Sequence, residues 1–251
     1  MMDYDGTLAP FHAERHRATP YPAVMSLLRE IMDTGRTSVV IVSGRDANDI
    51  LPFLGFHPPP EIWGLHGFQR RRSNGSIEIP NLDERTQTGL SDAQRWLAYQ
   101  GLQHAAELKH ASVAVHWRGL DDRQAEEWRG RVLLGWNTIA QSSGLRLLEF
   151  DGGVEICARE TDKGAAVRAL LSDVDSDTPA AFLGDDITDE CAFRALGERG
   201  LSVLVRPRHR KTSAQIWIQP PDDLLEFLRL WLEASHGERI LRGKPQATVN
   251  R

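Results

Sequence analysis

Apolar side chains recur along the chain at two spacings, and the wider one predicts helices. Residues 24–31 carry a stripe of apolar positions with the period of an α-helix, and Gly35 follows as a stop signal. Asp46 and Gly55 enclose a shorter segment of the same kind, as N-cap and stop. Further stripes predict helices over residues 91–99, 123–139, 165–171, 191–196 and 222–232.

Short runs of β-branched and other apolar residues predict strands between these helices. Residues 37–42 are apolar on both faces, which is typical of a buried parallel strand. Strands and helices alternate at both ends of the chain, and this order predicts an α/β fold with a Rossmann-like, doubly wound parallel sheet. The other predicted strands cover residues 62–65, 112–117, 146–150, 154–156, 180–183 and 201–205.

The alternation is interrupted near residue 70. Asn74-Gly75 is a hairpin turn signal that joins residues 68–71 to residues 77–79. Helix and strand patterns are then mixed in an order that predicts a separate α+β unit. We therefore expect a core made of residues 1–82 and 157–235, an inserted unit at 83–156, and a mobile polar tail at 236–251.

Composition and charge place the chain among ordinary soluble globular proteins. Of its 251 residues, 41% are hydrophobic and 26% are charged, and the net charge is −5. This charge argues against binding to nucleic acid or to an anionic membrane. No apolar run is long enough to span a bilayer, and the first residues lack the regions of a signal peptide. With only Cys157 and Cys191, we expect no disulfide framework and a reducing, cytoplasmic location.

Candidate chemistry begins with two carboxylates at the start of the chain. Asp3 and Asp5 are two positions apart, so in an extended segment they project to the same face, and Gly6 permits a turn directly after them. Two like charges this close require a positive group nearby, and a divalent cation with oxygen ligands supplies one. The pair therefore indicates a site for metal and phosphate, although a surface turn of the Asx type fits the same residues taken alone.

Other polar residues follow later strands of the predicted sheet. Ser43 ends one strand, Asp185, Asp186 and Asp189 follow another, and Lys163 begins a helix between them. The carboxyl ends of parallel strands meet at one edge of the sheet, where α/β proteins bind ligands. Each residue alone fits a cap or a turn, but their common placement predicts one functional site.

These motifs resemble those of the haloacid dehalogenase-like phosphatases. The four motifs of that superfamily are matched by Asp3-Tyr4-Asp5-Gly6-Thr7, Ser43, Lys163 and Gly184-Asp185-Asp186-Ile187-Thr188-Asp189. The resemblance narrows to the trehalose-6-phosphate phosphatase family, because further segments are similar to patterns of that family. These segments are Val42-Ser43-Gly44-Arg45, His66-Gly67, Glu107-Leu108-Lys109, His116-Trp117-Arg118, Val154-Glu155 and Asp162-Lys163-Gly164.

The resemblance implies a role for each core motif. Asp3 is the nucleophile that forms an aspartyl-phosphate, and Asp5 protonates the leaving group and then activates water. Ser43 and Lys163 contact the phosphoryl oxygens and complete the catalytic set. The implied phosphate-binding residues are Gly6, Thr7, Ser43, Gly44 and Lys163. The implied cofactor is Mg²⁺, held by Asp3, Asp5, Asp185, Asp186 and Asp189.

The resemblance also identifies the insert as a cap domain of the C2 type, which closes over the site and selects the sugar. For Glu107 and Lys109, a surface ion pair is the alternative interpretation, and His116 fits a packed core histidine equally well. The implied substrate contacts come from Arg45, His66, Glu107, Lys109, Arg118 and Glu155.

The implied function is hydrolysis of trehalose 6-phosphate by a cytoplasmic monomer, with a sugar-phosphate synthase as the candidate macromolecular partner. One alternative is a phosphatase for glucosylglycerol phosphate, mannosyl-3-phosphoglycerate or sucrose phosphate. Another is a catalytically silent module that binds sugar phosphates. Members of the family carry four or five apolar residues before the nucleophile, whereas only Met1 and Met2 precede Asp3 here, so we expect a very short or truncated first strand.

Overall fold

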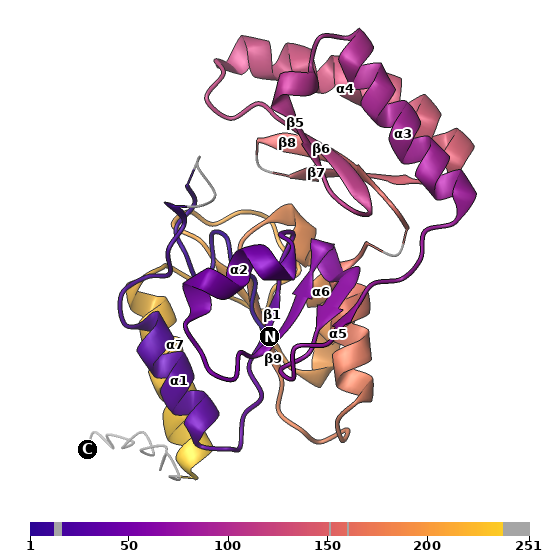
Figure 1. Ribbon diagram of the computed structural model, residues 1–251. Helices are drawn as coiled ribbons and strands as arrows, with labels where there is room; N and C mark the ends of the chain where they lie inside the picture. The colour runs from indigo at the N-terminus through magenta and orange to yellow at the C-terminus, as the bar shows by residue number, and fades with distance from the viewer. Residues whose placement is uncertain (13–16, 151, 160, 238–251) are drawn as a thin grey trace, which may run out of the picture.

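The computed structural model describes residues 1–12, 17–150, 152–159 and 161–237, which form two units with different sheets (Figure 1). The two ends of the chain build the lower unit in this view, called the core below. Residues 84–157 build the upper unit, called the insert. The core contains a parallel sheet and the insert an antiparallel one, and each unit has its own cluster of buried apolar side chains.

Parallel strands form the centre of the core, in agreement with the α/β sheet predicted from the sequence. They fall into two groups, and an antiparallel hairpin extends the first group at its outer edge. Asn74 and Gly75 lie in the turn of that hairpin, as expected. The first group contains β1 (Val40–Val42), β2 (Glu61–Gly64), β3 (Gln69–Arg71) and β4 (Ile77–Glu78), and the second contains β9 (Ala181–Gly184), β10 (Leu201–Val205) and β11 (Ile216–Ile218).

The first residues of the chain join these two groups into one sheet. Met2 forms parallel bridges to both β1 and β9. Its N–H donates to Val40 O at 2.9 Å, and its carbonyl accepts from Val42 N at 2.8 Å. On the other side, Asp3 N donates to Leu183 O at 2.9 Å. The first strand is therefore short, but it is central, and it delivers Asp3 to the carboxyl edge of the sheet.

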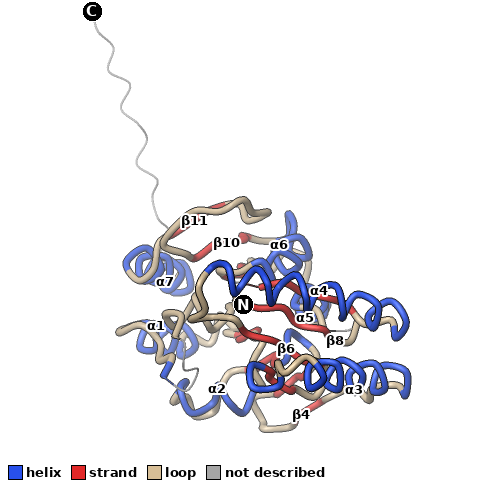
Figure 2. Tube along the Cα trace, turned by 90° about the horizontal axis from the view of Figure 1, so that it is seen from above, coloured by secondary structure: helices blue, strands red, loops and turns tan. Residues whose placement is uncertain are grey.

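Helices cover both faces of the core sheet, as a doubly wound fold requires. The helices α1 and α7 lie side by side on one face together with α2, where they bury Ile41 of β1 (Figure 2). The helices α5 and α6 cover the other face, where they bury Val40 and Val42. The bounds are α1 (Val24–Asp33), α2 (Ala47–Leu54), α5 (Lys163–Ser172), α6 (Glu190–Leu196) and α7 (Asp222–His236).

The insert is a four-stranded antiparallel sheet with two helices packed on one face. Val154 and Ile156 face these helices and the fully buried Trp136, whereas Glu155 between them points the other way, toward the core. Figure 1 shows the two helices on the side of the insert away from the core. The helices are α3 (Glu84–Tyr99) and α4 (Asp122–Ser143), and the strand order is β5 (Ala106–Leu108), β6 (Ser112–His116), β8 (Gly153–Cys157) and β7 (Arg146–Phe150).

Local signals and structure agree best where a cap and a glycine enclose an element. Asp46 accepts from Asn48 N at 2.8 Å to start α2, and Gly55 ends it with φ 63°. The predicted strand at residues 37–42 is shorter in the structure, because regular pairing begins at Val40. The 3-10 turns are η2 (Leu65–Gly67), η3 (Gln103–Ala105), η4 (Ile187–Asp189) and η5 (Gly197–Arg199).

Three elements differ from the sequence prediction. The helix expected at residues 91–99 already begins at Glu84, where Asp83 caps it by accepting from Thr86 N at 2.7 Å. The strands β5 and β11 were not predicted, because each has three residues and forms by pairing with the next or the preceding strand of the chain, β6 and β10. Of the tail predicted to be mobile, residues 238–251 lie outside the described residues. Within the described ranges, every helix is too short or too polar to cross a membrane.

Candidate active site

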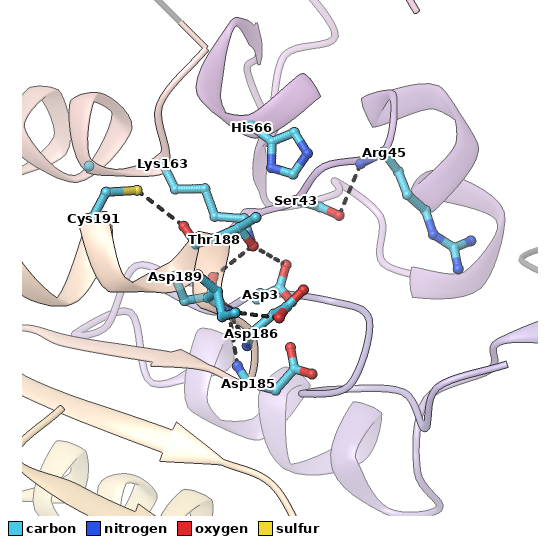
Figure 3. A network of polar contacts seen from close by, with 12 residues as sticks. Asp3, Ser43, Arg45, His66, Lys163, Asp185, Asp186, Thr188, Asp189 and Cys191 are labelled. Atoms are coloured by element: carbon cyan, nitrogen blue, oxygen red, sulfur yellow. Dashed lines mark hydrogen bonds and ion pairs between the residues drawn. The ribbon is translucent and has the colours of Figure 1, made fainter. Parts of the chain in front are cut away.

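Three carboxylates converge at the carboxyl ends of the parallel strands. Asp3 follows the short first strand, whereas Asp185 and Asp189 lie between β9 and α6. One carboxylate oxygen from each of the three lies within 4.8 Å of the others. Figure 3 shows these side chains gathered around Lys163. All three are buried, so the cluster concentrates negative charge away from water, as the sequence predicted for this edge of the sheet.

Lys163 supplies positive charge inside this cluster. It is the first residue of α5, and its Nζ donates to Asp3 Oδ1 at 2.8 Å and to Asp189 Oδ1 at 2.7 Å. Burial alone would lower the pKa of Lys163, but the two carboxylates outweigh burial and raise the pKa above its usual value. Lys163 therefore remains a cation throughout the physiological pH range.

Asp189 fixes the backbone of the segment that carries Asp185. Its Oδ2 accepts hydrogen bonds from the N–H groups of Asp185 and Asp186, both at 3.0 Å. Because its Oδ1 binds Lys163, both oxygens of Asp189 have partners. Asp186 starts η4 by accepting from Ile187 N at 2.7 Å. The segment is thus held from inside by Asp189, and the Asp185 carboxylate faces Asp3.

The turn after Asp5 passes directly over Asp185. Gly6 has φ 81°, which favours glycine, and a Cβ at this position would collide with the Asp185 carboxylate. The next residue, Thr7, is fully buried. Gly6 therefore permits the close approach of the Asp3–Asp5 segment to the acidic segment from β9.

Burial determines the electrostatics of the cluster. It raises the pKa of Asp3 to about 7, and the attraction of Lys163 offsets this only in part. Burial also raises the pKa of Asp185 well above its usual value, with the charges of Asp3 and Asp189 acting in the same direction. Asp185 Oδ1 is buried and has no hydrogen-bond partner in the described part of the chain. An excess of buried carboxylates with an unpartnered oxygen fits a hard divalent cation, which oxygen ligands bind preferentially.

Asp5 forms a bidentate ion pair with Arg45. Arg45 Nε donates to Asp5 Oδ2 at 2.6 Å, and Nη2 donates to Oδ1. The guanidinium is buried against the rings of Tyr4 and Phe53, with Cζ at 5.3 and 6.0 Å from the ring centroids. Each oxygen of Asp5 thus accepts a hydrogen bond from the same guanidinium, which fixes the orientation of the carboxylate.

Ser43 and Gly44 form a tight turn at the end of β1. His66 N donates to Ser43 O at 2.8 Å, and a Cβ at Gly44 would lie 2.5 Å from His66 Nε2. His66 and the preceding Leu65 have φ values of 55° and 51°, which are unfavourable for residues other than glycine. The strained Leu65–His66 segment therefore packs the His66 ring directly against the Ser43–Gly44 backbone.

Glu155 is a point of contact between the insert and the core. It accepts from Lys109 Nζ at 3.0 Å and from Ser112 Oγ within the insert, and His66 Nε2 of the core lies 3.0 Å from its Oε2. Burial alone would raise the pKa of Glu155, but the charge of Lys109 and the contact with His66 lower it well below its usual value. Burial lowers the pKa of His66. Glu155 is therefore an anion held by three donors.

Arg118 makes a second contact between the two units. Its Cζ lies 3.8 Å from the centroid of the Phe11 ring, in the segment that follows the opening turn. Glu107 is placed differently, because its Oε2 lies 2.9 Å from His116 Nε2 within the insert. Lys109, Arg118 and Glu155 therefore face the core, whereas Glu107 binds a histidine of its own unit.

A cleft of about 80 Å³ lies between the core and the insert. Gly6, Thr7, Glu107 and Asp189 are predicted site residues that do not line it in the described part of the chain. Gly6 and Asp189 act on its lining through Asp185. The predicted residues that line the cleft are Asp3, Asp5, Ser43, Gly44, Arg45, His66, Lys109, Arg118, Glu155, Lys163, Asp185 and Asp186.

Similarity to known proteins extends over most of the chain, and a family model described as trehalose-phosphatase matches residues 1–219. The chain belongs to the trehalose-phosphatase family. It is 29% identical over 243 residues to the trehalose-phosphate phosphatase of Mycobacterium ulcerans, which covers 90% of this chain and 59% of that protein. It is 28% identical over 208 residues to the bifunctional trehalose-6-phosphate synthase/phosphatase of Thermoproteus tenax, covering 82% of this chain and 28% of that protein. The chain therefore spans less than two thirds of the length of either relative.

A solved structure shares the fold of this trehalose-phosphatase family member. The C-terminal domain of the C. albicans trehalose-6-phosphate phosphatase superimposes with a TM-score of 0.79 at 21% identity, over 92% of this chain and 90% of that one. At this identity the likeness supports the fold, a haloacid dehalogenase-like α/β core with an α+β insert.

Several residues at the site of this family member were missed by sequence reasoning. Phe11 and Ser112 contact predicted site residues, but nothing in their local sequence distinguishes them. Arg210 donates to the backbone carbonyls of the acidic segment. A signal was present for Arg210, because it belongs to a basic run at residues 206–211 that directly follows a parallel strand.

Proposed function

We propose that the protein is a Mg²⁺-dependent phosphatase that hydrolyses trehalose 6-phosphate to trehalose and phosphate. The observation that carries this proposal is a single cleft with Asp3, Lys163 and Asp185 on one side and polar side chains of the insert on the other. Membership of the trehalose-phosphatase family supports the substrate, and the relatives described above are named for this activity.

Asp3 is the proposed nucleophile. Its carboxylate attacks phosphorus to form an aspartyl-phosphate, and Lys163, 2.8 Å from its Oδ1, offsets the negative charge that accumulates there. The Ser43 hydroxyl, which lines the same cleft, donates a hydrogen bond to a phosphoryl oxygen. Asp3 and Asp185, with Asp186 and the carbonyl of Asp5, are the proposed ligands of Mg²⁺, which neutralises phosphate charge when bound.

Asp5 is the proposed general acid and base. It donates a proton to the sugar oxygen that leaves phosphorus and then takes one from the water that attacks the aspartyl-phosphate. Arg45 donates to both oxygens of Asp5, and we propose that this ion pair opens before Asp5 carries and transfers its proton. The phosphate of an incoming substrate is an alternative anionic partner for the Arg45 guanidinium. Substrate binding can therefore draw Arg45 away from Asp5.

The insert is the proposed cap that selects the sugar. Lys109, Arg118 and Glu155 offer charged groups that can bridge pairs of sugar hydroxyls, and they face the catalytic residues across the cleft. The cleft holds about 80 Å³, whereas sites for small molecules usually measure about 300–1,000 Å³. A disaccharide phosphate therefore requires the insert to move away from the core, which breaks the Glu155–His66 and Arg118–Phe11 contacts.

A phosphate-release panel tests this function. The purified protein with Mg²⁺ is given trehalose 6-phosphate, glucosylglycerol phosphate, mannosyl-3-phosphoglycerate and sucrose phosphate, with Asp3→Asn as the inactive control. We expect the highest kcat/KM for trehalose 6-phosphate and a selective loss of that preference in Glu155→Gln. Equal turnover of all four esters contradicts the substrate assignment, and no turnover of any of them favours a silent binding module.

We further propose that the protein acts as a cytoplasmic monomer and that a trehalose-6-phosphate synthase is its partner. The bifunctional Thermoproteus tenax relative supports the second point, because there the synthase and phosphatase names belong to one protein. Light scattering after size-exclusion chromatography measures the state of the protein alone and with a synthase. A stable dimer in the absence of partner contradicts the monomer proposal.

A further inference from the structure

The loop that follows β10 lies beside the acidic segment of the proposed metal site. Parallel pairing sets Leu204 of β10 opposite Gly184 of β9, so the residues after each strand emerge next to each other. On β9 these residues are Asp185 and Asp186, and on β10 they are the basic run at residues 206–211. The fold thus brings a group of cations to the outer side of the carboxylate cluster.

Arg210 uses its guanidinium as a clamp on the acidic segment. Its Nη2 donates to Asp186 O at 2.6 Å, and its Nε donates to Asp185 O at 3.3 Å. Its Nη1 donates to Glu190 Oε1 at 2.5 Å. One planar group therefore connects two consecutive backbone carbonyls with the first residue of α6, a geometry that the fork of arginine can satisfy and a lysine ammonium cannot.

Glu190 anchors this guanidinium from the other side. Its carboxylate also accepts from Thr212 Oγ1 at 2.7 Å and from Ser213 N at 2.8 Å, both in the segment that follows Arg210. Glu190 therefore ties the Arg210 guanidinium to α6 and to the loop after β10. The side chains of Arg210 and Glu190 are 18% and 13% exposed. Arg206 adds one hydrogen bond to Asp185 O at 3.3 Å.

The acidic segment is consequently held from two sides. Asp189 accepts from the N–H groups of Asp185 and Asp186 on the inside, and Arg210 donates to their carbonyls on the outside. Such a double restraint is needed because Asp3, Asp185 and Asp189 repel one another. Without it, the segment could relieve this repulsion by turning the Asp185 carboxylate away from Asp3.

We propose that Arg210, anchored by Glu190, is a positioning residue that holds the Asp185–Asp186 segment in the geometry that binds the divalent cation. The role rests on the proposed function of this cluster. Within the described residues, Arg210 does not line the cleft, and it acts on the acidic segment through the backbone carbonyls and not through the carboxylates proposed as metal ligands. It therefore controls the affinity for Mg²⁺ rather than the chemical step.

Two measurements on four proteins test the role. The variants are Arg210→Met, which removes the clamp, Arg210→Lys, which keeps the charge without the fork, and Arg208→Met, a matched control in an exposed position of the same loop. Calorimetric titration measures the affinity for Mg²⁺, and amide hydrogen exchange without metal measures the opening of residues 185–189. We expect about tenfold weaker Mg²⁺ binding and faster exchange at these residues in both Arg210 variants, with wild-type behaviour for Arg208→Met. Because Mg²⁺ restores the site by mass action, kcat at saturating Mg²⁺ should remain near wild type.

The outcomes separate this role from the proposed function. Unchanged Mg²⁺ affinity and unchanged exchange in Arg210→Met overturn it, as does an equal effect of Arg208→Met, which indicates general charge loss. If the wild type does not bind Mg²⁺ but Arg210→Met still accelerates exchange at residues 185–189, the positioning role stands and the metal assignment fails. Should Arg210→Met not fold, Glu190→Gln weakens the same anchor, and the same changes are expected with smaller size.

Discussion

Replacement of Asp3 by asparagine is predicted to stabilise the metal-free protein while it abolishes the proposed phosphatase activity. Asp3 is 4% exposed, and its carboxylate lies near two other carboxylates, with Lys163 as its cationic partner. Burial raises its pKa from the usual 3.8 to about 7. An uncharged side chain of the same shape avoids this unfavourable charge but removes the proposed nucleophile.

The size of this stabilisation follows from the pKa shift of Asp3. Each unit of pKa corresponds to about 1.4 kcal/mol, so a rise from 3.8 to about 7 corresponds to roughly 4 kcal/mol against the charged form. The asparagine side chain keeps an oxygen that can accept from Lys163 but loses the ionic part of that contact, which reduces the gain. We expect a net increase of about 1–3 kcal/mol in the free energy of unfolding above pH 7.

The pH dependence gives the sign of the effect. Between about pH 4 and pH 7, folded wild type retains a proton on Asp3 that the unfolded chain has released. The stabilisation that comes from this retained proton is therefore fully present below about pH 4 and is lost as the pH rises through 7. The variant lacks this loss, so its advantage should grow from pH 4 to 7 and stay constant above. Both proteins share every other titrating group, and the difference between them reports Asp3 together with Asp185 and Lys163, whose pKa values depend on its charge.

Urea denaturation in EDTA, followed by tryptophan fluorescence at several pH values, measures this difference. Asp177→Asn, a replacement in an exposed loop, is the matched control and should follow the wild type. Adding Mg²⁺ should stabilise the wild type more than Asp3→Asn, because the variant has lost a proposed ligand. If Asp3→Asn is less stable than the wild type at pH 8 in EDTA, or if their difference does not change with pH, the electrostatic account of the cluster is wrong.

Three further changes test other parts of the structure. Lys163→Met leaves Asp3 and Asp189 without their shared cation and should cost about 3–5 kcal/mol in urea denaturation of the metal-free protein at pH 8; unchanged stability contradicts its charge-balancing role. Gly44→Ala places a Cβ 2.5 Å from His66 Nε2 and should cost about 1–3 kcal/mol and lower kcat/KM, whereas Gly130→Ala, with open space around it, should be harmless. In a chain that begins at Met1, the amino group donates to Ala181 O at 2.9 Å, and burial lowers its pKa from 8.0 to about 5, so stability of that chain should rise from pH 5 to 8 by up to about 4 kcal/mol. Four apolar residues added before Met1 should remove this pH-dependent rise in stability. They should also increase Tm by filling the 450 Å³ apolar cavity that Met1 lines. An unchanged pH profile of the extended protein contradicts the account of the Met1 amino group.

Local sequence signals predicted those elements whose ends are determined by residues within the same turn. Asp46 and Gly55 define α2 by a cap and a left-handed stop, and both act within their own turn. In contrast, β11 has only three residues, and it forms a strand because β10 lies beside it. The early start of α3 was missed because its first turns are polar, although the Asp83 cap was available as a signal.

The same distinction applies to the candidate site. Asp3, Lys163 and Asp185 could be placed together from the sequence, because parallel topology brings strand ends to one edge. The pairing of Asp5 with Arg45 could not, since it depends on the path of the chain between residues far apart in sequence. Arg210 lies in a basic run that the sequence shows, but its target, the backbone of another loop, could not be predicted from the sequence.

The central claim, that Asp3 is the nucleophile of a trehalose 6-phosphate phosphatase, is tested most directly by trapping the covalent intermediate. The protein is mixed with Mg²⁺ and trehalose 6-phosphate, quenched in acid, and reduced with borohydride, which converts an aspartyl-phosphate to homoserine. Peptide mass spectrometry then locates the modified residue. We expect homoserine in place of Asp3 in the wild type and no modification with EDTA or in Asp3→Asn. Modification of Asp5 instead, or turnover of trehalose 6-phosphate by Asp3→Asn at the wild-type rate, would contradict the account.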